Sequence, residues 1–162
     1  MHTTRENPAL AHWHRMEGLV QAWLRERQQL LYLLCAVQGL RGLEEDREPL
    51  DTRVSRLCEV LVDYISAGYF EIYQELAREA RWVHSANHRL IRHILARLEA
   101  STEEALCFNE DFDTPQQIRA RKDELPARLS RLLEQLEERF ALEDQLILSI
   151  HHSGSAEVPV IQ

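Results

Sequence analysis

Three histidines in the segment 84–93 are the residues of this chain best suited to metal binding. His84 and His88 stand four residues apart and could share one face of a helix, with His93 further along. Imidazole is a common zinc ligand, but the same spacing arises when histidines on a helix simply face solvent. The Glu-x-x-His spacing of di-iron helical bundles does not occur in the sequence. We therefore expect no bound metal, and a metal site at these histidines is the alternative.

Sequence motifs for catalysis are also missing. The chain contains no glycine-rich phosphate loop and no G-x-S-x-G, Cys-x-x-Cys or HExxH motif. Three cysteines, Cys35, Cys58 and Cys107, lie far apart, each inside an apolar periodic stretch, and this predicts small buried thiols. We expect a protein that is not an enzyme and that requires no cofactor.

Glu143 is a carboxylate on the stripe of the last predicted helix that should be apolar. A buried carboxylate needs a partner, because removing a charge from water is costly. Arg27 falls on the apolar stripe of the first predicted helix and could be that partner. We predict a structural pair between Glu143 and Arg27, with a binding role for Glu143 as the alternative. The neighbouring Arg139 and Asp144 are expected to face solvent.

The stretch LVDYISAGYFEIYQEL, residues 61–76, is apolar on most sides but contains a second, mixed face. Steps of three and four residues from Asp63 lead to Ser66, Phe70 and Tyr73, apart from the apolar stripe of the same helix. An acid, a hydroxyl and two aromatic rings on one face are typical of protein interfaces. The stretch is therefore either a central core helix with a few polar residues, or a helix that serves both the core and a partner.

These residues must be positioned by helices. Only five glycines and five prolines interrupt the 162 residues, which leaves long stretches with 3.6-residue apolar periodicity. This pattern predicts an all-α protein. We expect an antiparallel bundle of four long helices with additional short helices, formed by one domain at 1–152, and a disordered tail at 153–162.

Capping residues indicate where the helices begin and end. The predicted helix starts are Pro8, Asp51 or Thr52, a residue near Ser85, Thr114 with Gln117 completing a capping box, and Pro126. The first helix is expected to end near Gly39 or Gly42, and the second near Arg81.

Composition and charge narrow the class of partner. The chain is 44% hydrophobic and 28% charged, as expected for a folded globular protein. Its formal charge is −8, and the segment 99–113 holds six acids and no Lys or Arg. Such a charge disfavours direct contact with nucleic acid or an anionic membrane and favours a basic partner. No apolar run approaches the ~20 residues of a membrane span, and the N-terminus lacks a signal-peptide core, so we expect a cytoplasmic protein.

Three motifs resemble those of the Rsd/AlgQ family, bacterial regulators named for binding the primary sigma factor of RNA polymerase. LVDYISAGYFEIYQ resembles the family motif Asp-Tyr-x-Ser-Ala-Gly-His-Phe-x-Ile-Tyr-Glu. ERFALEDQLIL, at 138–148, resembles the C-terminal motif, and AWLRER, at 22–27, resembles the first-helix motif. The segment LEASTEEA fits more loosely. The motifs keep their order and spacing from about Leu19 to Ile150.

The resemblance implies a non-catalytic helical bundle that binds the primary sigma factor and covers its promoter-reading C-terminal domain. Carried over by position, Asp63, Ser66 and Phe70 match the partner-facing residues of the family, and Tyr73 is a neighbouring candidate. The sequence departs from the motif with Tyr69 in place of histidine and with glutamine in place of the final glutamate. A small-molecule or metal-binding bundle built around Glu143 and the histidines is the alternative function. The oligomeric state is not indicated by the sequence.

Overall fold

The computed structural model describes residues 8–39, 48–75 and 85–156, and these residues form helices joined by turns, without a strand. The helical elements are α1 (Pro8–Val37), α2 (Leu50–Ala67), the π-helical turn η1 (Gly68–Tyr73), α4 (Ser85–Phe112), α5 (Pro115–Ala120) and α6 (Leu125–Ala156). The prediction of an all-α protein is confirmed.

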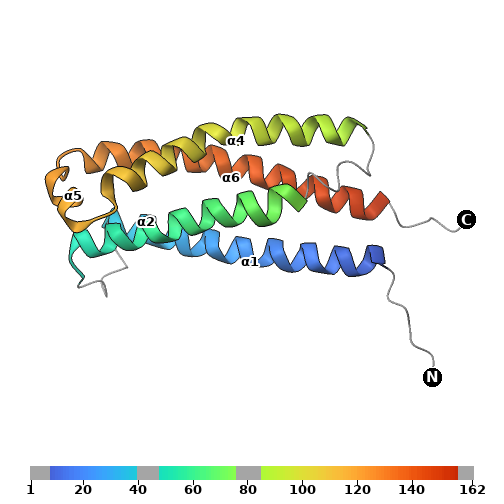
Figure 1. The fold of residues 1–162 in the computed structure, drawn as a ribbon, viewed down its shortest axis with the longest axis horizontal. Coiled ribbons are helices and arrows are strands. Elements are labelled where there is room, and N and C mark those ends of the chain that lie inside the picture. Colours follow the sequence, from blue (N-terminus) through green and yellow to red (C-terminus); the bar gives the residue numbers. More distant parts are fainter. Residues whose placement is uncertain (1–7, 40–47, 76–84, 157–162) are drawn as a thin grey trace, which may run out of the picture.

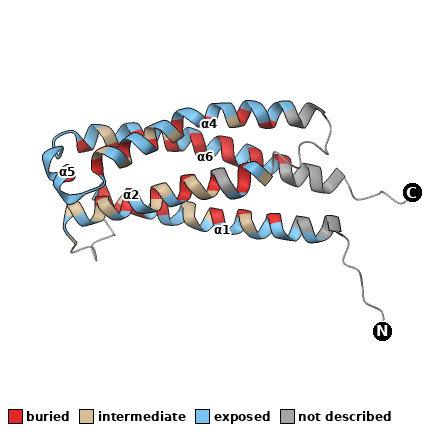
Figure 2. Cartoon of the chain, viewed as in Figure 1, coloured by how far each residue is buried: buried red, intermediate tan, exposed pale blue. Residues whose placement is uncertain are grey.

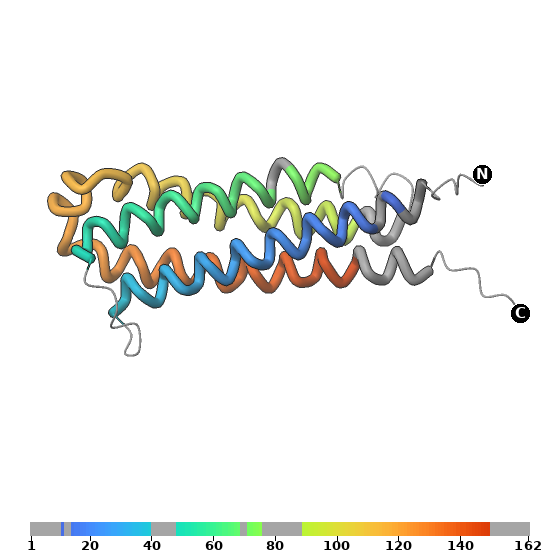
Figure 3. The backbone as a smooth tube through the Cα atoms, turned by 90° about the horizontal axis from the view of Figure 1, so that it is seen from below, coloured from blue at the N-terminus to red at the C-terminus, as the bar shows by residue number. Residues whose placement is uncertain are grey.

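The long elements form an antiparallel four-helix bundle. Packing contacts join α1 to α2, α2 to α4, α4 to α6, and α6 back to α1. Successive long helices run in opposite directions along the bundle, and the short α5 closes one end (Figure 1). The view from below shows α1 lying across α6 (Figure 3). The start of α1 and the end of α6 therefore lie together at the end opposite α5.

Buried residues recur along each long helix on the side that faces the other helices (Figure 2). Trp23 from α1, Tyr64 from α2 and Phe108 from α4 are among the largest of the fully buried residues. Burial of apolar surface contributes about 25 cal/mol per Å², so this continuous core is the main source of the stability of the bundle. The 3.6-residue periodicity of the sequence correctly indicates the buried faces.

Helix starts agree with the predicted caps in two of the later helices. At α5 the Thr114 hydroxyl accepts a hydrogen bond from the Gln117 backbone N–H at 3.2 Å, and the Gln117 side chain accepts one from the Thr114 N–H at 3.1 Å. This is the predicted capping box. Pro126 lies in the first turn of α6, which begins at Leu125, as expected for a residue without a backbone donor.

The start of α2 differs from the prediction. The N-cap is Pro49, whose extended backbone (ψ 152°) leads directly into the helix without a side-chain cap. Asp51, one of the predicted caps, lies inside the first turn, where its carboxylate accepts a hydrogen bond from the Thr52 N–H at 2.9 Å. The negative charge still lies where it interacts favourably with the helix dipole.

Two of the predicted helix ends, those of the first and last helices, lie within the described residues. Gly39 follows α1 with φ 69°, a left-handed conformation that glycine adopts without strain, so the predicted end is confirmed. The predicted end of the second helix near Arg81 lies outside the described residues. Helix α6 includes residues 153–156, which were predicted to belong to the tail, and residues 157–162 lie outside the described residues.

The three cysteines are free thiols in different environments. Cys58 is buried and donates a weak hydrogen bond to the Phe112 carbonyl at 3.4 Å, and burial raises its pKa to about 12. Cys35 is half-buried, whereas Cys107 is exposed on α4. The prediction of a buried thiol is therefore wrong for Cys107. In the part of the chain that the structure describes, no helix has the length and apolar character needed to cross a membrane.

Candidate functional site

A polar network fills the centre of the bundle around Glu143, whose side chain is fully buried. Its carboxylate accepts hydrogen bonds from Arg139 Nε at 2.8 Å, Arg27 Nη2 at 3.2 Å and the Tyr73 hydroxyl at 3.4 Å. The Tyr64 hydroxyl also donates to it. Donors from α1, α2, η1 and α6 thus converge on one carboxylate, which ties these elements together.

The contact expected between Arg27 and Glu143 is present, and Arg27 makes further contacts. Its Nη1 lies 2.7 Å from the Asp144 carboxylate, which is 58% exposed, and its Nε donates to the Tyr64 hydroxyl at 3.1 Å. The guanidinium also lies 4.9 Å from the centre of the Phe140 ring. Arg27 therefore links the buried carboxylate to the surface between α1 and α6.

Arg139 is a core residue, contrary to the prediction that it faces solvent. Its side chain is 1% exposed, and besides Glu143 it donates to Ser101 Oγ at 3.0 Å, Thr102 Oγ1 at 2.9 Å and the Tyr73 hydroxyl at 2.9 Å. Apart from Glu143, these acceptors belong to α4 and η1. Arg139 can be buried because the Glu143 carboxylate and the hydroxyls of Ser101 and Thr102 accept its hydrogen bonds inside the bundle. The periodicity of α6 alone does not reveal these partners on α4. One signal was present: Arg139 precedes Glu143 by one helical turn, the spacing of an ion pair.

Burial dominates the titration behaviour of the network. It raises the pKa of Glu143, and Arg139, Tyr64 and Arg27 oppose that rise. Burial and the Glu143 charge also raise the pKa values of Tyr64 and Tyr73. Both hydroxyls therefore stay protonated at neutral pH and act as donors to Glu143.

The Trp23 ring packs against residues of both α2 and η1. Trp23 stacks on Tyr64 with ring centres 5.6 Å apart and meets Tyr73 edge-on at 5.9 Å. A Cβ added at Gly68 would lie 3.2 Å from Trp23 Cζ2 and 3.3 Å from the Tyr73 hydroxyl oxygen. A methyl group here would be tightly packed, and the Trp23 ring or the Tyr73 hydroxyl would have to shift by a few tenths of an ångström to accommodate it.

The predicted partner-facing residues differ in how far they are exposed to solvent. Asp63 is exposed and Ser66 is half-buried, whereas Tyr73 is 7% exposed and belongs to the polar network. Position 70 lies within η1, but the Phe70 side chain is outside the described part of the chain. The prediction that Tyr73 shares a face with Asp63 assumed a continuous α-helix. In a π-helix each hydrogen bond spans one residue more, which rotates the following residues by about 100°.

Glu26 of α1, which the sequence does not single out, lies close to both Asp63 and Glu71. Glu26 of α1 is half-buried, and its Oε2 atom is shielded from solvent without a hydrogen-bond partner. Burial raises the pKa of Glu26, and the nearby charges of Glu71 and Asp63 raise it further. We call Glu26, Asp63 and Glu71 the acidic cluster. Glu26 belongs to α1, Asp63 to α2 and Glu71 to η1. The proximity of Glu26 to the other two follows from helix packing and cannot be predicted from sequence spacing.

The acidic segment of α4 divides into two groups. Glu104 lies 3.5 Å from Arg131, and Asp111 lies 2.7 Å from Arg128, so these two acids are held by cations of α6. The other four acids of the segment are exposed: Glu99, Glu103, Glu110 and Asp113. A large part of the charge of α4 is thus open to solvent.

Of the three histidines considered as metal ligands, only His93 has a described side chain. His93 is exposed, His84 lies outside those residues, and the side chain of His88 is not described. Among the residues that are described, no group of three potential ligands could hold a metal ion.

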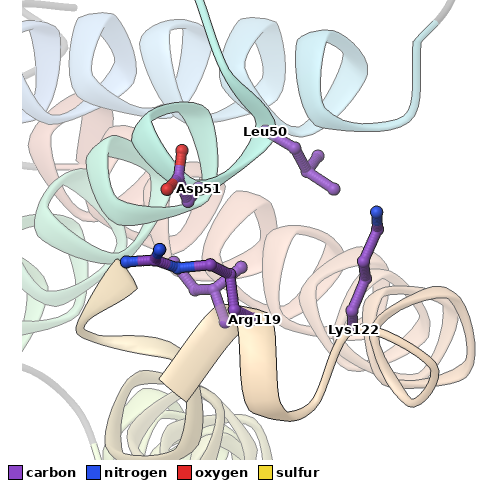
Figure 4. Close-up of a pocket in the computed structure, with 5 residues that line it drawn as sticks. Leu50, Asp51, Arg119 and Lys122 are labelled. Carbon is purple, nitrogen blue, oxygen red and sulfur yellow. The ribbon is translucent and has the colours of Figure 1, made fainter. Parts of the chain in front are cut away.

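A small pocket of about 180 Å³ lies at the α5 end of the bundle. It lies between Leu50 and Asp51 of α2 and Ile118, Arg119 and Lys122 in and after α5 (Figure 4). Ligand pockets usually have a volume of about 300–1,000 Å³. The pocket is smaller than that, and its lining residues are distinct from Glu143 and the histidines.

Residues 3–151 match the family described as "Regulator of RNA polymerase sigma(70) subunit, Rsd/AlgQ". The chain belongs to the Rsd/AlgQ family. The match covers both the polar network and the acidic cluster, so these features lie in the part of the chain shared with the family.

Relatives in the Rsd/AlgQ family carry a common name. The chain is 31% identical over 145 residues to "Regulator of sigma D" of Yersinia enterocolitica, covering 89% of this chain and 87% of the relative. It is 32% identical over 147 residues to the protein of the same name from Escherichia coli O1:K1 / APEC, covering 87% and 89%. No solved structure gives a significant match.

Proposed function

We propose that this protein is a transcription regulator that binds the primary sigma factor of RNA polymerase and covers its promoter-reading C-terminal domain, as an anti-sigma factor. The observation that carries the proposal is the match of residues 3–151 to a family described by its regulation of the sigma(70) subunit. The name "Regulator of sigma D" of its relatives supports the same conclusion. Action on RNA polymerase also requires the protein to work in the cytoplasm.

The outer surface of α2 and η1 is the proposed contact surface. Asp63 and Ser66 reach solvent there, and position 70 lies one helical turn further along. Glu26, which lies close to both Asp63 and Glu71, adds negative charge to this surface. A domain that reads DNA is basic, so an acidic surface of this kind can bind it in competition with DNA.

Binding alone accounts for this function. The buried hydroxyls of Tyr64 and Tyr73 and the buried carboxylate of Glu143 are satisfied by one another and by arginines, which is the pattern of a structural network. We propose that the protein has no catalytic activity, requires no cofactor and makes no direct contact with nucleic acid.

The test is calorimetric titration of the purified protein with the primary sigma factor of the same organism. Asp63→Ala should weaken binding by about thirtyfold or more, because an interface carboxylate paired with a cation typically contributes ~2 kcal/mol or more. The matched control is Asp123→Ala, which removes the same charge from an exposed turn next to α6. Phe70→Ala should also weaken binding while the helical content remains. If the wild-type protein does not bind sigma, the proposed function is wrong.

A further inference from the structure

The π-helical turn η1 lies directly between the polar network and the proposed contact surface. Its last residue, Tyr73, points inward, and its hydroxyl accepts a hydrogen bond from Arg139 Nη2 at 2.9 Å and faces the Glu143 carboxylate at 3.4 Å. Glu71, in the middle of the turn, is exposed and lies near enough to Glu26 of α1 to raise its pKa. One short turn thus carries an inner anchor and an outer charged residue.

Holding this turn in the π form requires a compensating interaction. π-helical turns are rare, and they occur mostly as single turns inside α-helices, frequently at functional sites. In a continuous α-helix, Tyr73 would follow Ser66 and position 70 on the outer face, and its hydroxyl would lose both polar partners. The network therefore favours the π form through the Tyr73 hydroxyl.

The acceptor and donor that hold Tyr73 are themselves fixed. Arg139 is bound to Ser101 and Thr102 of α4 at 3.0 Å and 2.9 Å, and Glu143 is held by Arg27 of α1 at 3.2 Å. Helices α4 and α1 thus hold Arg139 and Glu143, the two residues that bind the Tyr73 hydroxyl. The inner end of η1 is attached to a rigid frame.

We propose that Tyr73 is a positioning residue for the sigma-binding surface: its hydroxyl, held by Arg139 and Glu143, keeps η1 in the π form and so sets where position 70 and Glu71 lie relative to Asp63. The inference rests on the proposed function, because it concerns the geometry of the same contact surface. Tyr73 acts from inside the bundle and does not touch the partner.

Tyr64 provides a matched control for this role. Its hydroxyl also donates to Glu143 and is buried, but Tyr64 lies in the regular helix α2, before the π-helical turn. Tyr64→Phe and Tyr73→Phe each remove one buried hydroxyl from the same carboxylate and keep the ring. A role limited to stability would make the two variants equivalent in binding.

The experiment compares the full-length wild-type protein, Tyr73→Phe and Tyr64→Phe by affinity for the intact primary sigma factor and by amide hydrogen exchange of residues 68–75. We expect Tyr73→Phe to weaken binding about tenfold, as when the competent conformation falls to a tenth of the population, and to accelerate exchange in that segment. Tyr64→Phe should bind like the wild type. Equal affinities and unchanged exchange in Tyr73→Phe would falsify the inference.

A second variant perturbs the same turn from its other end. Gly68→Ala places a methyl group 3.2 Å from Trp23 and 3.3 Å from the Tyr73 hydroxyl oxygen, and alanine favours a regular α-helix. We expect the same loss of affinity with the same change in exchange. If Gly68→Ala changes the exchange of the turn but leaves affinity intact, the turn does not set the surface and the inference is overturned. These outcomes are distinct from a failure of the wild type to bind sigma, which would reject the proposed function itself.

Discussion

Glu143 illustrates how a single buried charge can organise a helical core. Four donors from four elements point at its carboxylate, so no lone pair of this group has to rely on solvent. A buried ion pair adds little net stability compared with an apolar core, but removal of one partner leaves the others uncompensated. For this reason we expect the role of Glu143 to be structural.

Glu143→Ala should lower the free energy of unfolding by roughly 3 to 5 kcal/mol, because it leaves the buried Arg139 guanidinium without its carboxylate and removes the buried partner of Arg27. Chemical denaturation followed by circular dichroism measures this change. The control is Asp144→Ala, at the neighbouring and largely exposed acid, which should cost no more than about 1 kcal/mol. A Glu143→Ala protein that is as stable as the wild type but binds sigma poorly would instead assign Glu143 to binding.

Prediction from sequence succeeded for some of these residues and failed for others for an identifiable reason. Glu143 and Arg27 could be found because each interrupts an apolar stripe of its own helix. Arg139 was missed because a long side chain at the edge of a stripe can either extend into solvent or turn inward, and the choice depends on Ser101 and Thr102 of another helix. Such cross-helix partners leave no trace in the spacing of one segment.

At the level of elements, the helices could be predicted and the turn η1 could not. Apolar periodicity and the Thr114 cap are local properties, and they correctly indicated the long helices and the start of α5. The π form of η1 is imposed from outside by Trp23 against Gly68 and by the anchor of the Tyr73 hydroxyl. A prediction based on 3.6-residue steps correctly places Ile72 in the core but assigns Tyr73, which is also buried, to the outer face.

The packing of α1 against α2 and η1 produces the acidic cluster, and the cluster should make sigma binding depend on pH. Burial, Glu71 and Asp63 raise the pKa of Glu26 in the free protein. A basic group of a bound partner would lower that pKa, so binding would release a proton wherever Glu26 is still partly protonated. Affinity for sigma should therefore fall as the pH decreases below neutral, and because the pKa of Glu26 is raised, the fall should begin above the pH at which an ordinary glutamate titrates.

Calorimetric titration in two buffers with different ionisation enthalpies measures the released protons directly. In Glu26→Gln the proton release at acidic pH should decrease, while the fold of α1 should be retained because glutamine is a comparable helix former. Proton release that is identical in the wild type and in Glu26→Gln would show that another group titrates.

For the whole molecule, the fold class followed from composition and periodicity because a four-helix bundle needs only amphipathic helices and short connections. The net charge of −8 is a property of the surface rather than of the fold. Exposed acids of α4 and the acidic cluster of α1, α2 and η1 give the bundle a long-range attraction for a basic domain.

Salt should therefore slow association with the sigma factor. The Debye length shrinks from ~10 Å at about 0.1 M salt to ~3 Å at about 1 M, which screens the approach of charged surfaces but leaves buried contacts largely unaffected. We expect the association rate, measured by stopped flow, to fall steeply over this range, and promoter DNA to compete for the sigma factor. A rate that does not depend on salt, with DNA and this protein bound to sigma together, would place the interface elsewhere on sigma.

The different environments of Cys58 and Cys107 give this bundle a convenient site for a fluorescent label. Maleimide dyes react with thiolates, and the raised pKa of the buried Cys58 keeps it protonated and unreactive at neutral pH. Cys107 is exposed on α4, close in sequence to the open acids Glu103 and Glu110. With the half-buried Cys35 replaced by serine, a dye at Cys107 would sit on the charged outer face of α4 and could report the arrival of a partner in real time.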